Sequence, residues 1–190
     1  MLRRMWSVFV LICIGGISGM TACDLSVTNA GPVPDDALND SIANSSIVTG
    51  MGSSFSLALG YIAYTGGIVS KEIVASGSRN VPKLGVSIKQ RAGIFDPGLE
   101  ESNSHWIFAQ QARWIAEDGV RRMRSNLGDG FSKNALAAEA LVDAGFAERL
   151  LGENMCVGII DGGPAQSRTI YFERAEAEFT EAIVVANAAG

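Results

Sequence analysis

Apolar residues recur at steps of three and four in four segments of the chain, which is the spacing of one face of a helix. The segments are 36–75, 103–127, 133–151 and 172–188. The positions expected to be buried are Ile47, Met51, Phe55, Ala58, Ile62, Val69 and Ile73; Trp106, Ala109, Ala112, Ala116, Val120, Met123 and Leu127; Leu136, Ala140, Ala144, Ala147 and Leu151, with Ala137 and Leu141 opening a second face; and Phe172, Ala175, Phe179, Ala182 and Ala186. The third helix, apolar on more than one side, is expected to lie between neighbours.

Capping residues predict where these helices begin, and glycines predict where they stop. The expected N-caps are Asp35 or Asp36, Asn103 or Ser104, and Ser132. The glycines expected to divide the first helix or to end the third are Gly50, Gly52, Gly66, Gly67 and Gly152.

Two stretches without periodicity separate the helices. Residues 76–102 contain several glycines and prolines, and a loop of this length is functional or packed over the surface. Residues 153–170 contain Asp161-Gly162-Gly163-Pro164, which predicts a turn rather than a calcium site, because calcium needs six or more oxygen ligands. No segment alternates in the manner of a strand, so the chain is predicted to be all-α with long loops.

The first 22 residues form a separate unit. Arg3 and Arg4 precede an uncharged stretch from Met5 to Gly19, which is too short to span a membrane and ends in small residues. This layout predicts a secretory signal peptide over 1–22 rather than a retained membrane anchor.

The signal ends in a motif that resembles the bacterial lipobox, Met20-Thr21-Ala22-Cys23, with Met where Leu is more usual. The resemblance implies cleavage before Cys23 and acylation of that residue, and two or three acyl chains anchor a protein stably. An ordinary signal followed by an unrelated cysteine is the alternative. Residues 23–34, with Pro32 and Pro34, are expected to be an extended tether between lipid and fold.

Charge narrows the possible partners. Of the 190 residues, 47% are hydrophobic and 18% are charged, which excludes a highly charged disordered chain. Removing Arg3 and Arg4 with the signal leaves 13 basic and 20 acidic residues, a net charge of -7. A general nucleic-acid binder needs a basic face, so nucleic acid is not an expected partner.

The mature chain keeps Cys23 and Cys156, of which Cys23 is expected to be lipidated. Cys156 is therefore expected to be either buried and reduced or paired with a group outside the chain.

No enzyme signature is found in the sequence. The single histidine, His105, has no partner indicated by spacing, and the pairs Asp35-Asp36 and Glu100-Glu101 diverge too much for acid/base work. We therefore expect no catalytic residue, no metal and no cofactor.

Binding residues are only weakly indicated. Tyr61, Tyr64, Trp106 and Trp114 are candidates for stacking on a ligand, although aromatic residues in a helical chain are more often part of the core. The cluster Arg121, Arg122 and Arg124 is either an anion site or, as favoured, a solvated cationic helix end.

The last helix is predicted to have an exposed acidic side, formed by Glu173, Glu176, Glu178 and Glu181.

Beyond the lipobox, several short segments carry a second resemblance. They are Cys23-Asp24-Leu25-Ser26-Val27-Thr28-Asn29, Leu38-Asn39-Asp40, Ala58-Leu59-Gly60, Gly66 to Glu72, Gln111-Ala112-Arg113, Ala144 to Ala147, Leu151 to Cys156 and Arg174 to Ile183. On these residues the chain resembles the SusD/RagB family of outer-membrane lipoproteins. Ala175, Phe179 and Ala182 also have the spacing found in the second helix of a tetratricopeptide repeat.

The resemblance implies tetratricopeptide-like helical hairpins over 35–190, the amino-terminal part of a longer SusD-like domain. It implies a lipoprotein on the outer face of the outer membrane, held there by its lipid. It also implies a SusC-like TonB-dependent transporter as partner, to which glycans or peptides are passed. The alternative is a helical-repeat lipoprotein that scaffolds the cell envelope and binds no nutrient.

Overall fold

The computed structural model describes residues 34–73 and 100–190, apart from the side chains of 100–102. The predicted signal, Cys23 and nearly all of the tether and of the 76–102 loop lie outside the described residues. In chain order the elements are two short 3-10 helices, η1 (Asp35–Asn39) and η2 (Ser41–Ala43), then α2 (Asn44–Val69), α4 (Glu100–Leu127), a 3-10 helix η4 (Gly128–Lys133), α5 (Ala135–Asn154), the strands β1 (Val157–Gly158) and β2 (Gln166–Ser167), and α6 (Thr169–Ala189).

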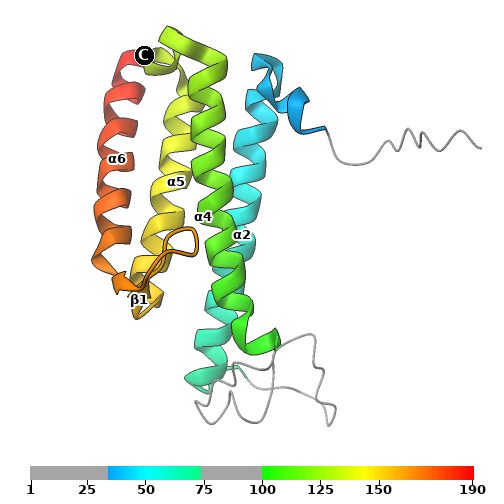
Figure 1. The fold of residues 1–190 in the computed structure, drawn as a ribbon, viewed down its shortest axis with the longest axis vertical. Helices are drawn as coiled ribbons and strands as arrows, with labels where there is room; N and C mark the ends of the chain where they lie inside the picture. Colours follow the sequence, from blue (N-terminus) through cyan, green and yellow to red (C-terminus); the bar gives the residue numbers. More distant parts are fainter. Residues whose placement is uncertain (1–33, 74–99) are drawn as a thin grey trace, which may run out of the picture. The chain divides into compact units, whose positions relative to one another are not determined.

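Four long helices pack against one another, which confirms the all-α prediction (Figure 1). The strands are two residues each and form one antiparallel hairpin, Val157 opposite Ser167 and Gly158 opposite Gln166. Strands this short carry too few residues for alternation to be visible in the sequence.

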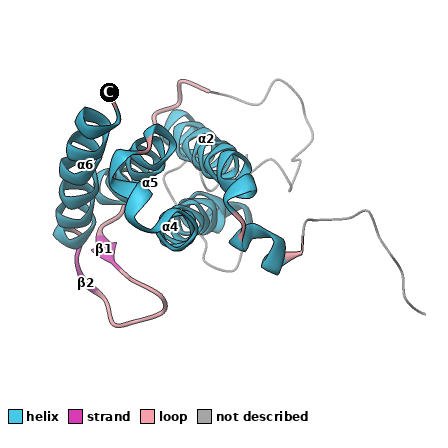
Figure 2. Ribbon diagram, turned by 90° about the horizontal axis from the view of Figure 1, so that it is seen from above, coloured by secondary structure: helices cyan, strands magenta, loops and turns pink. Residues whose placement is uncertain are grey.

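Helix α5 is the centre of the packing. It contacts α2, α4 and α6, while α2 and α4 also pack on each other. Seen from above, α6 lies beyond α5, on the side away from α2 and α4 (Figure 2). Most of α5 is therefore covered, as its two apolar faces predicted.

Alanines supply much of the core. Ala109, Ala112 and Ala116 on α4, and Ala140 and Ala144 on α5, are buried at predicted positions. Small side chains let helix axes come close and bring backbones into contact, so the high alanine content reflects helix packing.

The α5–α6 contact is closer than alanine would allow. A Cβ atom built on Gly145 would lie 2.6 Å from the ring of Phe179, and one built on Gly152 would lie 2.9 Å from the ring of Phe172. The two glycines and the two rings are each seven residues apart, so both rings rest directly on the backbone of the antiparallel helix. Gly152 therefore makes room for Phe172, and the prediction that it ends the helix is wrong, because α5 continues to Asn154.

The prediction that glycines divide the first helix is also wrong. Helix α2 runs unbroken from Asn44 to Val69, through Gly50 and Gly52, and Gly66-Gly67 lie only in its last turn. Each internal glycine costs about 1 kcal/mol of helix propensity. Burial of Ile47, Val48, Met51 and Ala58 against the neighbouring helices outweighs that cost.

The residues that cap the helices also differ from those predicted. Asp35 lies in η1 and Asp40 caps η2, its carboxylate accepting from Ile42 N at 3.0 Å. Asn134, and not Ser132, caps α5, accepting from Ala137 N at 3.2 Å. Either oxygen-bearing side chain suits a cap, so the chain's path through η4 decides between them.

At the helix ends, some of the residues that are buried differ from the positions expected to be buried. Ile68 is buried in place of Val69, and Tyr171 and Val185 are buried while Phe172 and Ala186 are exposed. Glu178 is half-buried rather than on an exposed acidic side. Which residue is buried at a helix end depends on the element that covers it, which the spacing pattern does not contain. Tyr171, for example, bonds Gln110 of α4 and the backbone of Ile159 in the hairpin loop.

Among the described residues, the segment Ser41–Val69 is long and apolar enough to cross a membrane by length and composition. A core helix passes the same test, and one face of this helix packs on α4 and α5.

Adding a methyl group to Gly145 tests the close α5–α6 contact. Gly145→Ala is expected to lower the free energy of unfolding by about 1–3 kcal/mol, because overpacking against Phe179 exceeds the roughly 1 kcal/mol gained in helix propensity. Urea unfolding followed by circular dichroism measures this.

Gly60→Ala on α2 is the matched control, since a Cβ there has nothing within 4 Å. It is expected to stabilise the chain by up to about 1 kcal/mol. Equal stabilisation by both substitutions would contradict the close contact.

Candidate functional site

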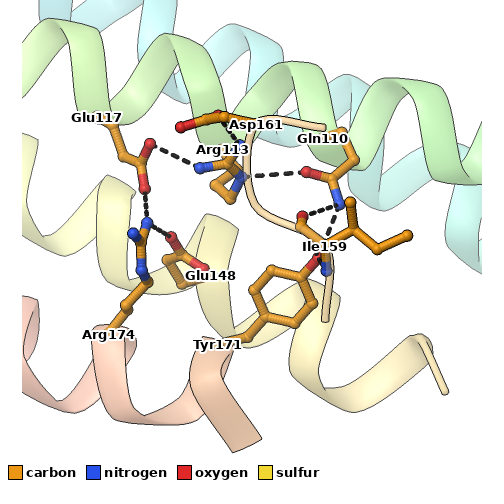
Figure 3. Close-up of polar contacts among 8 residues, drawn as sticks. All are labelled: Gln110, Arg113, Glu117, Glu148, Ile159, Asp161, Tyr171 and Arg174. Carbon is orange, nitrogen blue, oxygen red and sulfur yellow. Dashed lines mark hydrogen bonds and ion pairs between the residues drawn. The ribbon is translucent and has the colours of Figure 1, made fainter. Parts of the chain in front are cut away.

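A group of hydrogen-bonded polar side chains, of which Arg113, Glu148 and Tyr171 are buried, joins α4, α5, α6 and the hairpin loop (Figure 3). We call it the α4–α6 network. Its members are Gln110, Arg113 and Glu117 on α4, Glu148 on α5, Ile159 (through its backbone) and Asp161 in the loop, and Tyr171 and Arg174 on α6.

The network has a regular spacing along α4. Gln110 contacts Tyr171, Glu117 contacts Arg174, and Arg124, a further seven residues on, pairs with Glu181 at 2.5 Å. The partners are seven residues apart along α4, and three and then seven residues apart along α6. Residue numbers rise together along both helices, so α4 and α6 run parallel and meet through polar side chains.

Arg113 is at the centre. Its side chain is 3% exposed, and it donates to Gln110 Oε1 at 3.1 Å, to Glu117 Oε2 at 2.7 Å and to Asp161 Oδ1 at 2.6 Å. These hydrogen bonds compensate the cost of removing a guanidinium from water. Arg113 in turn lowers the pKa of the exposed Asp161 carboxylate by hydrogen bonding and opposite charge.

Asp161 is positioned by its turn. Asp161 and Gly162 both have positive φ, 49° and 72°, and Gly163 N donates to Ile160 O at 2.8 Å. Positive φ at both central residues is the pattern of a type I′ turn, for which Asp-Gly is a preferred sequence. The predicted turn is thereby confirmed.

Tyr171 ties the same loop to α6. Its fully buried hydroxyl donates to Ile159 O at 2.9 Å and accepts from Ile159 N at 2.9 Å and from Gln110 Nε2 at 2.8 Å. A phenol has one donor and two acceptor positions, so every one is used.

Glu148 is the least compensated charge in the network. It is 2% exposed, its Oε1 lies 3.3 Å from Arg174 Nη1, and its Oε2 has no hydrogen-bond partner in the described structure. Burial, together with the neighbouring Glu117 carboxylate, raises the pKa of Glu148 from 4.5 to about 8. Arg174 opposes this shift but is held more closely by Glu117.

The number of charged groups in the network also favours a protonated Glu148. The network has two guanidiniums, Arg113 and Arg174, and three carboxyl groups, Asp161, Glu117 and Glu148. One carboxyl group therefore lacks a guanidinium of its own, and burial favours the protonated form most strongly for Glu148, the most buried of the three.

The arginines at the end of α4 form no open anion site. Arg121 pairs with Asp118, and Arg124 pairs with Glu181 while stacking over Phe131 at 4.3 Å. Arg122 is buried and binds Asp118 at 2.6 Å and Asp35 at 2.5 Å. The favoured prediction of a solvated cationic end is therefore wrong for Arg122, because carboxylates from η1 and α4 surround it.

The four candidate aromatic residues do not form one surface. Tyr61 stacks on Phe108 with ring centroids 4.3 Å apart, and Trp106 packs beside Tyr171 in the core. Tyr64 is half-buried, and burial raises its pKa. Trp114 is 57% exposed, so it alone of the four presents most of its side chain to solvent.

The remaining candidate groups lie apart from one another. His105 is half-buried near the start of α4, and burial lowers its pKa. Cys156 is exposed, which excludes the first of its two predicted alternatives, a buried thiol, whereas pairing with a group outside the chain stays a prediction. The described residues contain no group of three or more side chains arranged to hold a metal ion.

Sequence reasoning missed every charged member of the α4–α6 network. A signal was present, because Arg113 interrupts the alanine face of α4 and Glu148 follows Ala147 on the crowded side of α5. A charge inside an otherwise apolar face predicts a buried, paired group. Which carboxylate meets which guanidinium depends on helix register, which the pattern does not contain.

No family model matches the chain, and neither the curated proteins nor the solved structures contain a significant match.

The raised pKa of Glu148 predicts that the free energy of unfolding depends on pH. Between pH 4.5 and about 8 the unfolded chain releases the Glu148 proton while the folded chain keeps it, so stability falls as pH rises. Glu148→Gln, which stays neutral, is expected to remove up to about 1.4 kcal/mol per pH unit of this slope. Urea unfolding at several pH values between 5 and 8 measures it.

Glu153→Gln on the same helix is the control, because Glu153 is exposed and its ion pair among the described residues is with the exposed Arg149, at 2.7 Å. This variant should keep the wild-type slope of the free energy of unfolding against pH. If Glu148→Gln also retained that slope, Glu148 would be ionised in the folded protein.

Proposed function

We propose that this protein is a lipid-anchored lipoprotein of the outer membrane that captures glycans or peptides for a SusC-like TonB-dependent transporter. Its helical domain is SusD-like in this proposal and has no catalytic role. The position of Cys23 at the end of the uncharged amino-terminal run is the observation that carries the proposal.

The packing of the helices supports a tetratricopeptide-like arrangement. Consecutive helices are antiparallel neighbours, and α6 stacks on α5 rather than joining α2 and α4 around one centre. Gly145 and Gly152 on α5 make room for the rings of Phe179 and Phe172 on α6, and small residues of this kind let the helices of such repeats approach closely.

A ligand-binding role is supported by Trp114. A large exposed aromatic face on a rigid helix suits stacking against a sugar ring or a peptide side chain. The half-buried Tyr61 and Trp106 are less suited, because core neighbours cover their faces.

A scaffold lipoprotein without a nutrient ligand is the second candidate. The partial burial of Tyr61, Tyr64 and Trp106 favours it, as does the groove between α5 and α6, which is lined mostly by apolar side chains. Helical repeats bind proteins through such surfaces.

Metabolic labelling with palmitate tests the anchor. The wild-type chain is expected to take up the label and Cys23→Ala to lose it. Cys156→Ala is the matched control, because its exposed thiol is the competing acylation site among the described residues, and it should label normally. Unchanged labelling of Cys23→Ala would exclude Cys23 as the lipidated residue.

Ligand capture is tested by titrating the full chain with glycans and peptides in a calorimeter. Trp114→Ala is expected to weaken binding by roughly tenfold, since loss of one stacked ring costs about 1–1.5 kcal/mol. Ile107→Ala, at another exposed apolar position of α4, should bind as wild type. Absence of heat with every ligand would favour the scaffold.

A further inference from the structure

An apolar groove runs between α5 and α6 on the molecule's surface. Ala138 and Val142 line it from α5, and Phe179, Ile183 and Ala186 line it from α6. It encloses about 440 Å³. Its residues recur at steps of three and four along both helices, so the groove follows the helix axes and offers the surface into which a further helix packs.

Exposed apolar side chains extend along this groove. Ile183 is 63% exposed, and Val142 at the groove and Phe146 one turn further along α5 also reach solvent. Phe146 packs edge-on against Phe179, with centroids 5.2 Å apart, and against Phe55 of α2 at 5.9 Å. A continuous apolar surface therefore crosses three helices.

Two carboxylates lie at this surface. Glu139 lines the groove, and Asp143, one turn along α5, lies half-buried against α2 at Gly52 with no cation partner in the described structure. Burial and the neighbouring Glu139 raise the pKa of Asp143 to about 6. The α2 helix carries no charged residue, and Arg149, further along α5, is already paired with Glu153.

We propose that the α5–α6 groove binds an amphipathic helix of a partner protein that carries lysine or arginine beside its apolar stripe. Apolar side chains of the partner fill the groove over Ile183 and Val142, and its cations neutralise Glu139 and Asp143. A second copy of this chain fits less well, because it would bring the same carboxylates together without a cation. The site depends on neither the lipid anchor nor a nutrient ligand.

Two designed helical peptides provide the probe, one with leucine flanked by lysine and one with leucine flanked by glutamate in the same pattern. Binding to the full chain in mild non-ionic detergent is followed by fluorescence anisotropy. The lysine peptide is expected to bind at least tenfold more tightly than the glutamate peptide.

Ile183→Asp is expected to weaken lysine-peptide binding by about tenfold through loss of an apolar contact and Glu139→Lys by a similar factor through like charge. Val184→Asp is the matched control. Val184 is adjacent in sequence and equally exposed at 63%, but it lines a different hollow, on the outer side of α6. It should bind as wild type, and circular dichroism confirms that each variant is folded.

Several outcomes would overturn the proposal. If both peptides bound with equal affinity, charge would play no role in binding. If Val184→Asp lost as much affinity as Ile183→Asp, the peptide would bind outside the groove. Concentration-dependent dimers that Ile183→Asp abolishes would identify a second copy as the occupant. Binding to phosphatidylethanolamine vesicles that Ile183→Asp abolishes would identify a lipid surface, and no binding of either peptide would exclude this kind of partner.

Discussion

The close approach of α5 to its neighbours is the constraint on which the remaining structure depends. The helix contacts three others, and glycine or alanine occupies many of the positions where they meet. Gly145 and Gly152 allow two phenylalanine rings to lie on the backbone of α5. Small residues contribute little burial individually, so stability comes from many contacts at short range rather than from a few large side chains.

That short spacing also explains the polar network. Side chains of α4 and α6 meet beside α5, where Arg174 of α6 contacts both Glu117 of α4 and Glu148 of α5 (Figure 3). Charges removed from water must be paired, and the pairs form only when α4 and α6 are in register. Arg113, Glu117, Arg174 and Asp161 therefore specify how the two helices and the hairpin loop are aligned. A protonated Glu148 completes the network without adding an unpaired charge.

The charged groups of α4 and α6 differ from those beside the α5–α6 groove. Cations of α4 and α6 are engaged by carboxylates, and Arg122 joins α4 to the segment that follows the predicted tether. On the α5–α6 side the groove is apolar and its flanking charges are acidic. Our proposals for a surface lipoprotein and for a helical partner use different parts of the chain, the amino-terminal cysteine for one and the helix groove for the other.

The sequence by itself determined that the chain is all-α, roughly where its helices lie, and which faces of α4 and α5 are buried. Those properties follow from local spacing of apolar residues. The tertiary structure decided the continuity of α2 through its glycines, the choice of Asn134 as a cap, and the burial of Arg113 and Glu148. Each of these depends on contacts with another helix or on the path of the chain between helices, and packing energy across such contacts exceeds the local preference of about 1 kcal/mol that a sequence pattern expresses.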